Sequence, residues 1–281
     1  MSKGYVMLAQ NSEYDYVEQA CLCAMSLHAT NDNPLISLIT NDSVPEEYVS
    51  LFDKIIEIPW SDQANESDWK VENRWKIYHA SPYDETIVLD TDMLVLQDIS
   101  SWWKFLSNYD LYFTSKVFTY RNKQVVDTVY RKAFIANNLP NLYSGLHYFK
   151  KTETAHEFYR WLELVMNNWE LFYSTHVKEH CPKRPSVDVS AAVVAKILNC
   201  ETEITNGIVK YPSFVHMKPA IQDWLYGADR WQSRVGVYLN DDLELTIGNH
   251  VQQSIFHYTE KDFVTNDIIN RYKKYLGMQH V

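Results

Sequence analysis

Two aspartates in the stretch YDETIVLDTDMLVLQDI, residues 83–99, have the residue types and spacing best suited to chemistry. Asp90 and Asp92 lie between the apolar runs 86–89 and 93–96, where a soluble protein normally places uncharged side chains. Alternate residues of an extended segment point the same way, so the two carboxylates should lie close together and repel each other. A divalent cation relieves that repulsion, and Mg²⁺ and Mn²⁺ take carboxylate oxygens while leaving coordination positions for phosphates. The pair therefore predicts a Mn²⁺ or Mg²⁺ site.

The usual backbone cradles for phosphate are absent from the sequence. The chain of 281 residues has 7 glycines, with no Gly-x-Gly-x-x-Gly and no Gly-x-x-x-x-Gly-Lys. Such loops neutralise phosphates through their backbone N–H groups. If the protein binds a nucleotide, a metal at Asp90 and Asp92 would supply the missing neutralisation.

The elements that must position the aspartates alternate between strands and helices. Apolar runs at 5–9, 35–39, 55–58 and 86–89 predict strands, and residues 17–25, 45–52 and 71–80 predict helices between them. This alternation is typical of a parallel sheet with helices on its faces. Asp90 and Asp92 then fall at the carboxyl end of the fourth strand, where such sheets bind ligands.

The second half of the chain has a less regular pattern. Strands are predicted at 110–113, 146–149 and 254–258, helices at 153–167, 187–198 and 266–276, and an irregular excursion at 116–140. No repeat, low-complexity tract or composition shift marks a linker. We therefore expect one α/β domain over residues 1–281, with a Rossmann-like, mostly parallel central sheet, helices on both faces and a more irregular C-terminal half.

Composition and charge argue against a nucleic-acid-binding protein and against a membrane-spanning one. The net charge of −10 argues against nucleic-acid binding, which needs a basic face. No apolar run approaches the ~20 residues that cross a bilayer, and the beginning MSKGYVMLAQ is unlike a signal peptide. The cysteines show no metal-binding spacing, and we expect reduced, mostly buried thiols of a cytoplasmic protein. The oligomeric state stays open, a homo-oligomer included.

The aspartate stretch resembles the metal-binding segment of glycogenin-like glycosyltransferases, family 8 of the retaining GT-A enzymes. YVMLAQNSEYDYVEQACLCAMSLHAT is similar to that family's first strand and helix, and LISLITNDSVPEEYVSLFDKIIEIPW to its next strand–helix–strand step. RWKIYHASPYD resembles the basic-headed helix before the Asp-x-Asp strand. The resemblance covers residues 4–105 well and is patchy beyond. It implies a single GT-A-type domain with a nucleotide-binding half, 1–105, and a donor-sugar and acceptor half, 106–281.

The resemblance implies roles for residues of the first half. Asp90 and Asp92 would hold the metal, and Thr91 between them is assigned to the nucleotide. Arg74, with Lys76 as a near alternative, would lie near the phosphates or the donor sugar. The residues at the positions that hold uracil and ribose in the family are Leu8, Gln10, Asn11 and Tyr14.

The second half departs from the family at two positions near the donor sugar, and in SIFHYTEKDF the family's glycine and Pro-Trp are missing and the spacing to Lys is shorter. NLYSGLHYF resembles the strand whose Asn and Ser face the donor sugar; Ser144 and Gly145 match, Tyr143 replaces the Asn, and Asn141 lies nearby in the sequence. SVDVSAAVVAKIL resembles a segment in which an Asp and a Gln flank the reaction centre; Asp188 matches, and Val189 stands in place of the Gln. The resemblance makes Asp188 a catalytic candidate, and a plain helix N-cap is the alternative.

A third metal ligand is expected near the C-terminus. SIFHYTEKDF resembles a family segment in which a His completes the metal shell and a Lys meets a phosphate, which makes His257 and Lys261 the candidates. FVHMKPAIQDW offers a competing His216, but the Lys218–Pro219 step forces an extended turn directly after it. We therefore favour His257.

The function expected from these features is metal-dependent transfer of a sugar from a nucleoside-diphosphate sugar, with UDP as the implied nucleotide and retention at the anomeric carbon. The acceptor, carbohydrate or protein, is not readable from the sequence. One alternative is a haloacid-dehalogenase-like, Mg²⁺-dependent phosphatase, because IVLDTDMLV also fits its nucleophile motif and Asp241–Asp242 offer a further acidic pair. The other is a sugar-nucleotide-binding module without catalysis.

Overall fold

The first half of the chain forms alternating strands and helices, as expected. The computed structural model describes residues 1–65, 67, 70–126, 131–205, 212–222, 224 and 230–278. It contains the strands β1 (Lys3–Leu8), β2 (Ile36–Ile39), β3 (Lys54–Ile56) and β4 (Glu85–Leu89). Between them lie α1 (Tyr16–Thr30), α2 (Glu46–Val49), a 3-10 turn (Arg74–Lys76) and α3 (Ile77–Ala80).

The central sheet has six strands in the order β3-β2-β1-β4-β8-β6. The pairs β3–β2, β2–β1 and β1–β4 are parallel, and β8 (Tyr143–Lys150) is antiparallel to both β4 and β6 (Leu111–Thr114). In this sheet β8 alone, among the described strands, runs against the rest. The expectation of a single, mostly parallel α/β domain is therefore confirmed.

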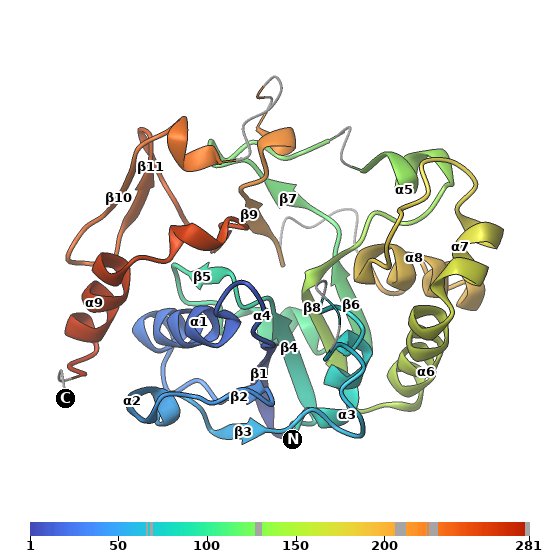
Figure 1. Cartoon of the computed structure of the whole chain (residues 1–281), viewed down its shortest axis with the longest axis horizontal. Helices are drawn as coiled ribbons and strands as arrows, with labels where there is room; N and C mark the ends of the chain where they lie inside the picture. The colour runs from blue at the N-terminus through green and yellow to red at the C-terminus, as the bar shows by residue number, and fades with distance from the viewer. Residues whose placement is uncertain are drawn as a thin grey trace.

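Helices cover both faces of this sheet (Figure 1). α1 and α4 (Trp102–Leu106) pack on one face against side chains such as Met7 and Ile87, whereas α6 (Glu153–Asn167) and α8 (Val187–Leu198) pack on the other face against Val6 and Val88. Neighbouring residues of one strand point to opposite faces, which is why Val6 and Met7 belong to different clusters of the core. A strand that is buried on both faces has an almost continuous run of apolar residues in its sequence, and β1, β2 and β4 show such runs.

A second sheet brings distant segments to the aspartates. Its order is β5-β13-β9-β7, formed by β5 (Met93–Val95), β13 (Ile255–His257), β9 (Phe214–His216) and β7 (Val117–Phe118). β5 begins directly after Asp92, and His257 is the register partner of both Met93 and His216. This pairing carries His257 to the metal-binding stretch. The remaining α-helices and strands are α5 (Lys132–Ala136), α7 (Trp169–His176), the small sheet β10 (Val237–Leu239), β11 (Leu245–Ile247) and β12 (His250–Val251), and α9 (Asn266–Tyr275). Short 3-10 helices lie at Pro219–Ile221, Trp231–Ser233 and Lys261–Phe263.

Several predicted elements differ in extent, and three of them are shorter or more ordered than expected. The helix predicted over 71–80 begins only at Arg74, because the buried Asn73 side chain donates to Gln10 and Asp62 and thereby fixes the preceding backbone outside a helix. The helix predicted over 45–52 ends at Val49, since Leu51 and Phe52 turn into the core. The excursion 116–140 contains β7 and α5, and its residues 127–130 lie outside the described part.

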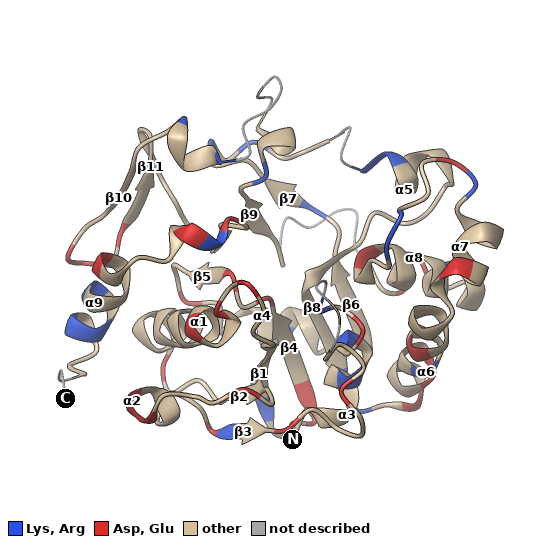
Figure 2. Ribbon diagram, in the orientation of Figure 1, with Lys and Arg blue, Asp and Glu red and all other residues tan. Residues whose placement is uncertain are grey.

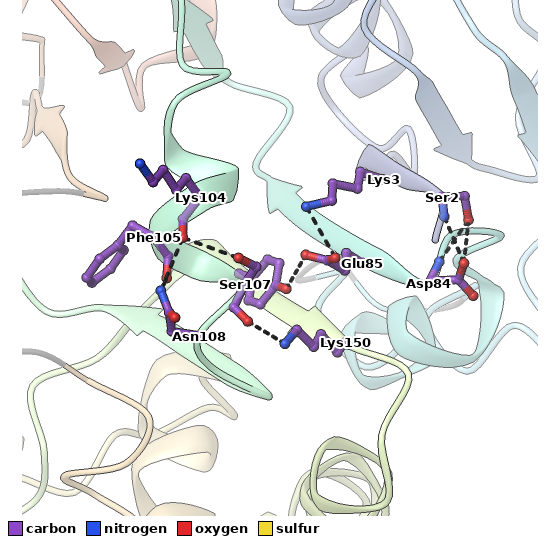
Figure 3. A network of polar contacts seen from close by, with 10 residues as sticks. Ser2, Lys3, Asp84, Glu85, Lys104, Phe105, Ser107, Asn108 and Lys150 are labelled. Atoms are coloured by element: carbon purple, nitrogen blue, oxygen red, sulfur yellow. Dashed lines mark hydrogen bonds and ion pairs between the residues drawn. The ribbon is translucent and has the colours of Figure 1, made fainter.

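Hydrogen bonds and an ion pair fasten the opposite ends of the strands, away from Asp90 and Asp92 (Figure 3). The buried Glu85 accepts a hydrogen bond from the Tyr148 hydroxyl at 2.7 Å and pairs with the Lys3 ammonium at 3.3 Å. Asp84 accepts from the backbone N–H of Ser2 at 2.7 Å. These contacts tie the beginnings of β1 and β4 to the end of β8. The carboxyl ends of β1 and β4, at the opposite end of the strands, are where the cavities lie.

The burial of the cysteines and the character of the helices can be compared with the sequence-based expectations. All four cysteines are unbridged; Cys21 and Cys23 are buried, Cys200 is half-buried, and Cys181 alone is exposed. Within the described part of the chain, no helix combines the length and the apolar character that crossing a bilayer requires.

Candidate active site

Two adjoining cavities lie at the carboxyl ends of β1 and β4. The larger, of about 640 Å³, is lined by residues after β1, by the segment 90–92 and by the segment 257–262. The smaller, of about 190 Å³, reaches Ser144, Gly145 and Asp188. The residues that line both are Val71, Arg74, Asp90, Lys218 and His257. The two cavities therefore form one groove, with Asp90 and His257 at the junction.

Asp90, Asp92 and His257 converge at this junction. One ligand atom of each lies within 4.8 Å of the others. The segment is not extended, because Thr91 and Asp92 form a turn, which corrects the expectation that strand geometry alone aligns the carboxylates. Asp90 is instead held by its backbone N–H, which donates to the Gly145 carbonyl at 2.8 Å, and Asp92 by the start of β5.

Cations of the chain itself neutralise both aspartates. The Arg74 guanidinium donates to Asp90, and the Lys261 ammonium donates to Asp92 Oδ2 at 2.6 Å. His257 Nε2 lies 3.1 Å from the same oxygen. Burial raises the pKa of Asp92, but His257 and Lys261 outweigh it and hold that pKa well below its usual range. Figure 2 shows basic and acidic residues side by side in the segment before α9 that supplies Lys261.

The two histidines considered as metal ligands, His216 and His257, lie next to each other. The His216 ring stacks on the His257 ring with centroids 4.7 Å apart, since β9 and β13 are paired in register at these residues. His257 reaches Asp92, whereas His216 lies behind it and lines only the smaller cavity. Burial and the neighbouring His257 lower the pKa of His216 well below its usual value. The structure thus brings His257 to the aspartates, as the sequence favoured.

Glycine is required at position 145. A Cβ built there would lie 2.5 Å from Asp90 Oδ2, which is closer than real Cβ contacts allow. Any side chain at this position would therefore displace the Asp90 carboxylate. Gly145 serves the site by its small size, and its carbonyl holds the Asp90 backbone.

Asp188 lies in the first turn of α8 but does not act as its N-cap, which is Ser186. Its Oδ1 accepts hydrogen bonds from the Ser144 backbone N–H at 2.8 Å and the Ser144 hydroxyl at 2.6 Å. Its Oδ2 accepts from Arg131 Nη1 at 2.7 Å. Burial raises the pKa of Asp188, and Arg131 and Ser144 together lower it below the usual value. The alternative of a plain cap is therefore wrong.

The remaining candidates divide between the groove and its support. Leu8, Gln10, Tyr14, Thr91 and Lys261 line the larger cavity. Asn11 does not line it; its side chain accepts from the Val17 backbone N–H and so supports the start of α1. Lys76 is fully buried and donates to the Ser61 carbonyl, away from the groove. Of the two basic residues considered, only Arg74 reaches the aspartates.

Several lining residues were not found from the sequence. Tyr16, Lys70 and Arg230 line the larger cavity, and the Lys261 ammonium lies 4.9 Å from the centre of the Tyr16 ring. Lys218, the lysine of the competing segment FVHMKPAIQDW, lines both cavities. Residues of the second half thus line the larger cavity as well, so it is not confined to residues 1–105. No local pattern marks these residues, because charged and aromatic side chains at irregular positions usually lie on an ordinary surface.

Comparisons with known proteins address the fold. No protein-family profile and no curated protein sequence matches the chain. Among solved structures, a galactosyltransferase LgtC in complex with donor and acceptor sugar analogs matches 99% of this chain and 96% of its own, with TM-score 0.55 and 14% identity. Mouse xyloside xylosyltransferase 1 matches 92% and 97%, with TM-score 0.52 and 12% identity.

A third structure, the glycosyltransferase GlyE of Streptococcus pneumoniae, matches 74% of this chain with TM-score 0.42 and 16% identity. The chain spans 46% of the length of that GlyE chain. The two matches over nearly the whole length have TM-scores above 0.5 and therefore share the overall fold of this chain. The chain has the fold of GT-A glycosyltransferases.

Proposed function

We propose that this chain is a glycosyltransferase that uses a nucleoside-diphosphate sugar together with Mn²⁺ or Mg²⁺. The observation that carries the proposal is the convergence of Asp90, Asp92 and His257 at the junction of two cavities, in a chain with this fold. UDP as the nucleotide and retention at the anomeric carbon are the finer parts of the proposal, and they come from the sequence resemblance to glycogenin-like enzymes.

The residues present fit a divalent cation. Two carboxylates and one imidazole, with ligand atoms within 4.8 Å of one another, are a donor set that Mn²⁺ accepts. When bound there, such a cation would stabilise the negative charge that develops on the leaving diphosphate. The larger cavity adjoins this cluster and is the better size for a nucleotide, since ligand sites commonly fall between about 300 and 1,000 Å³.

The side chains of the groove divide the work of binding. Leu8, Gln10 and Tyr14 would line the nucleotide. Gln10 is itself fixed, because its amide nitrogen donates to Asp62 at 3.0 Å and its oxygen accepts from Asn73 at 2.9 Å. Arg74 and Lys261 are the cations nearest the aspartates and would contact the diphosphate. The smaller cavity, with Ser144 and Asp188, would hold the donor sugar.

The phosphatase alternative finds no support in the groove. That chemistry needs a further acidic pair beside the first aspartate. Asp241 and Asp242 lie in the turn between β10 and β11, line neither cavity, and Asp241 pairs with Arg271 of α9 at 2.9 Å. A binding module without catalysis is distinguished from an enzyme by turnover alone.

The test is a panel of nucleoside-diphosphate sugars incubated with the full chain and Mn²⁺, with and without candidate sugar acceptors, while release of the nucleoside diphosphate is followed. We expect release with at least one donor, loss of release on chelation, and loss of release in Asp92→Asn. A chemically simple phosphate ester is included as a control substrate.

Two results would contradict the proposal. Metal-dependent binding of UDP without turnover of any donor would identify a binding module. Hydrolysis of the simple phosphate ester that disappears in Asp90→Asn would identify a phosphatase instead.

A further inference from the structure

A buried arginine forms part of the wall behind the smaller cavity. Arg131, just before α5, is 4% exposed. The centre of its guanidinium lies 3.7 Å from the ring centroid of Phe134 and 4.2 Å from that of Tyr143. Aromatic faces attract the guanidinium plane and keep water from it, so its hydrogen bonds must be made at its edge.

The edge of this guanidinium donates to two other segments of the chain. Nε donates to Asn141 Oδ1 at 2.6 Å, Nη2 donates to the Leu142 carbonyl, and Nη1 donates to Asp188 Oδ2 at 2.7 Å. Asn141 and Leu142 precede β8, and Asp188 lies in the first turn of α8. Arginine suits this position because its planar fork holds several acceptors in fixed directions.

The other oxygen of Asp188 is held just as firmly. Ser144 of β8 donates its backbone N–H and its hydroxyl to Oδ1. An ionised carboxylate offers about four acceptor sites, so these three bonds leave one site on Oδ2. The Asp188 side chain is 19% exposed and lines the smaller cavity. The Asp188 carboxylate is thus held at both oxygens and keeps one acceptor site. Such a carboxylate is suited to accept a hydrogen bond from a hydroxyl of a ligand.

We propose that Arg131 is a positioning residue that fixes the Asp188 carboxylate so that its remaining Oδ2 site accepts a hydroxyl of the donor sugar. This inference rests on the proposed function, because it assigns the smaller cavity to the sugar. Asp188 then acts as an ionised acceptor, and Arg131 itself does not touch the substrate.

The proposal also accounts for Tyr143, where the sequence resemblance leads one to expect an asparagine. The Tyr143 ring provides one of the two aromatic faces for Arg131 and packs edge-on against Phe214 and His216, with centroids 5.7 and 5.9 Å away. Asn141, the amide considered as a substitute, already accepts from Arg131. The Tyr143 ring at this position thus covers one face of the Arg131 guanidinium, which an asparagine could not do.

The test compares Arg131→Met, Arg131→Lys, Asp188→Asn and the double variant Arg131→Met/Asp188→Asn in the full chain. Arg271→Met is the matched control, because Arg271 also pairs with two carboxylates but lies on α9. Turnover of the best donor gives kcat and KM, and calorimetric titration of UDP with Mn²⁺ gives nucleotide affinity.

Misplacing a reacting group by a small distance costs up to ~100-fold in rate, so we expect Arg131→Met to lower kcat by about 10- to 100-fold. UDP affinity should not change, Arg131→Lys should restore part of kcat, and Arg271→Met should match the wild type. The double variant should match Asp188→Asn, since Arg131 acts through Asp188.

Arg131→Met leaves a buried carboxylate without its partner and could fail to fold, which a thermal melt detects. The double variant removes that charge and then decides the question by comparison with Asp188→Asn. A wild-type kcat in Arg131→Met, or a double variant far less active than Asp188→Asn, would overturn the role of Arg131 while leaving the proposed function standing. A wild-type chain that turns over no donor would overturn both.

Discussion

Lys261 pairs with Asp92 where the proposed metal ion would bind, and this makes a prediction with an unusual sign. Its ammonium lies 2.6 Å from Asp92 Oδ2, and the two side chains are 18% and 9% exposed. A divalent cation held by Asp92 and His257 would compete with Lys261 for the negative charge of this carboxylate. Replacing Lys261 by methionine keeps most of the side-chain volume and removes the competing charge. We therefore expect Lys261→Met to bind Mn²⁺ more tightly than the wild type when no nucleotide is present.

The magnitude follows from the geometry. Two unit charges 2.6 Å apart attract each other by about 6 kcal/mol at an effective dielectric constant of about 20. Several kcal/mol of this are offset by the desolvation of the two partly buried ions. A net competition of about 1–3 kcal/mol remains, which corresponds to roughly 5- to 150-fold in Mn²⁺ affinity, at about 1.4 kcal/mol for each factor of ten.

UDP should reverse the sign. A Lys261 released from Asp92 can pair with the diphosphate, so its loss removes a favourable charge contact when metal and nucleotide bind together. We expect Lys261→Met to weaken UDP binding at saturating Mn²⁺ while tightening Mn²⁺ binding in the absence of UDP. Free Mn²⁺ measured by electron paramagnetic resonance gives the first quantity, and calorimetry gives the second.

A control and a contrary result complete this experiment. Lys274→Met is the control, because Lys274 is 77% exposed on α9 and lies 3.9 Å from Asp241. It should change neither quantity. If Lys261→Met weakens Mn²⁺ binding in the absence of nucleotide, Lys261 does not compete with the metal but holds Asp92 in place, and the reasoning fails.

Four further predictions concern single residues. Asp92→Asn should abolish Mn²⁺-dependent UDP binding, as titration calorimetry would show, and should also lower the melting temperature, since it leaves Lys261 without its partner. His257→Ala should weaken apparent Mn²⁺ affinity at least 10-fold and His216→Ala much less; a larger shift for His216→Ala would mean that the wrong histidine was chosen. Thr259 has φ 61°, so Thr259→Gly should be about 1 kcal/mol more stable than Thr259→Ala in urea titration, because both variants lose the hydroxyl's hydrogen bond to the Met217 carbonyl and only glycine relieves the strain; a Gly variant less stable than the Ala variant would refute the strain. Burial lowers the pKa of His147 to about 4, so its neutral form contributes stability that is present above the unfolded pKa of about 6.5 and lost as pH falls to about 4. That loss amounts to about 3 kcal/mol, and His147→Gln should remove it from the pH dependence of unfolding; parallel curves would contradict this.

The sequence by itself predicted the order of strands and helices in the first half and the place of the two aspartates after a buried strand. Continuous apolar runs such as 86–89 become strands wherever both faces are buried, and this depends on composition over a few residues. The position of Asp90 and Asp92 after such a strand followed from the same local pattern. The helix α6 was found with its bounds, because its apolar period and its Thr152 cap are both local signals.

Only the tertiary structure decided which side chains meet. Arg74 and Lys76 are two residues apart and chemically alike, yet Arg74 reaches Asp90 while Lys76 is buried against Ser61. Likewise, Asn11 resembles a ligand contact in the sequence and supports α1 in the structure. The direction of a side chain at the end of an element is set by packing against distant segments, which no local pattern encodes.

The same reason explains why the support of the site was not foreseen. Arg131 and Asp188 are 57 residues apart in the chain, and their contact depends on how α8 packs beside β8. The two histidines that competed in the sequence, His216 and His257, stack on each other because β9 and β13 pair in register. Residue types and spacing thus indicated which chemistry to look for, and long-range packing decided which side chains lie together in the groove, because only folding fixes the distances between them.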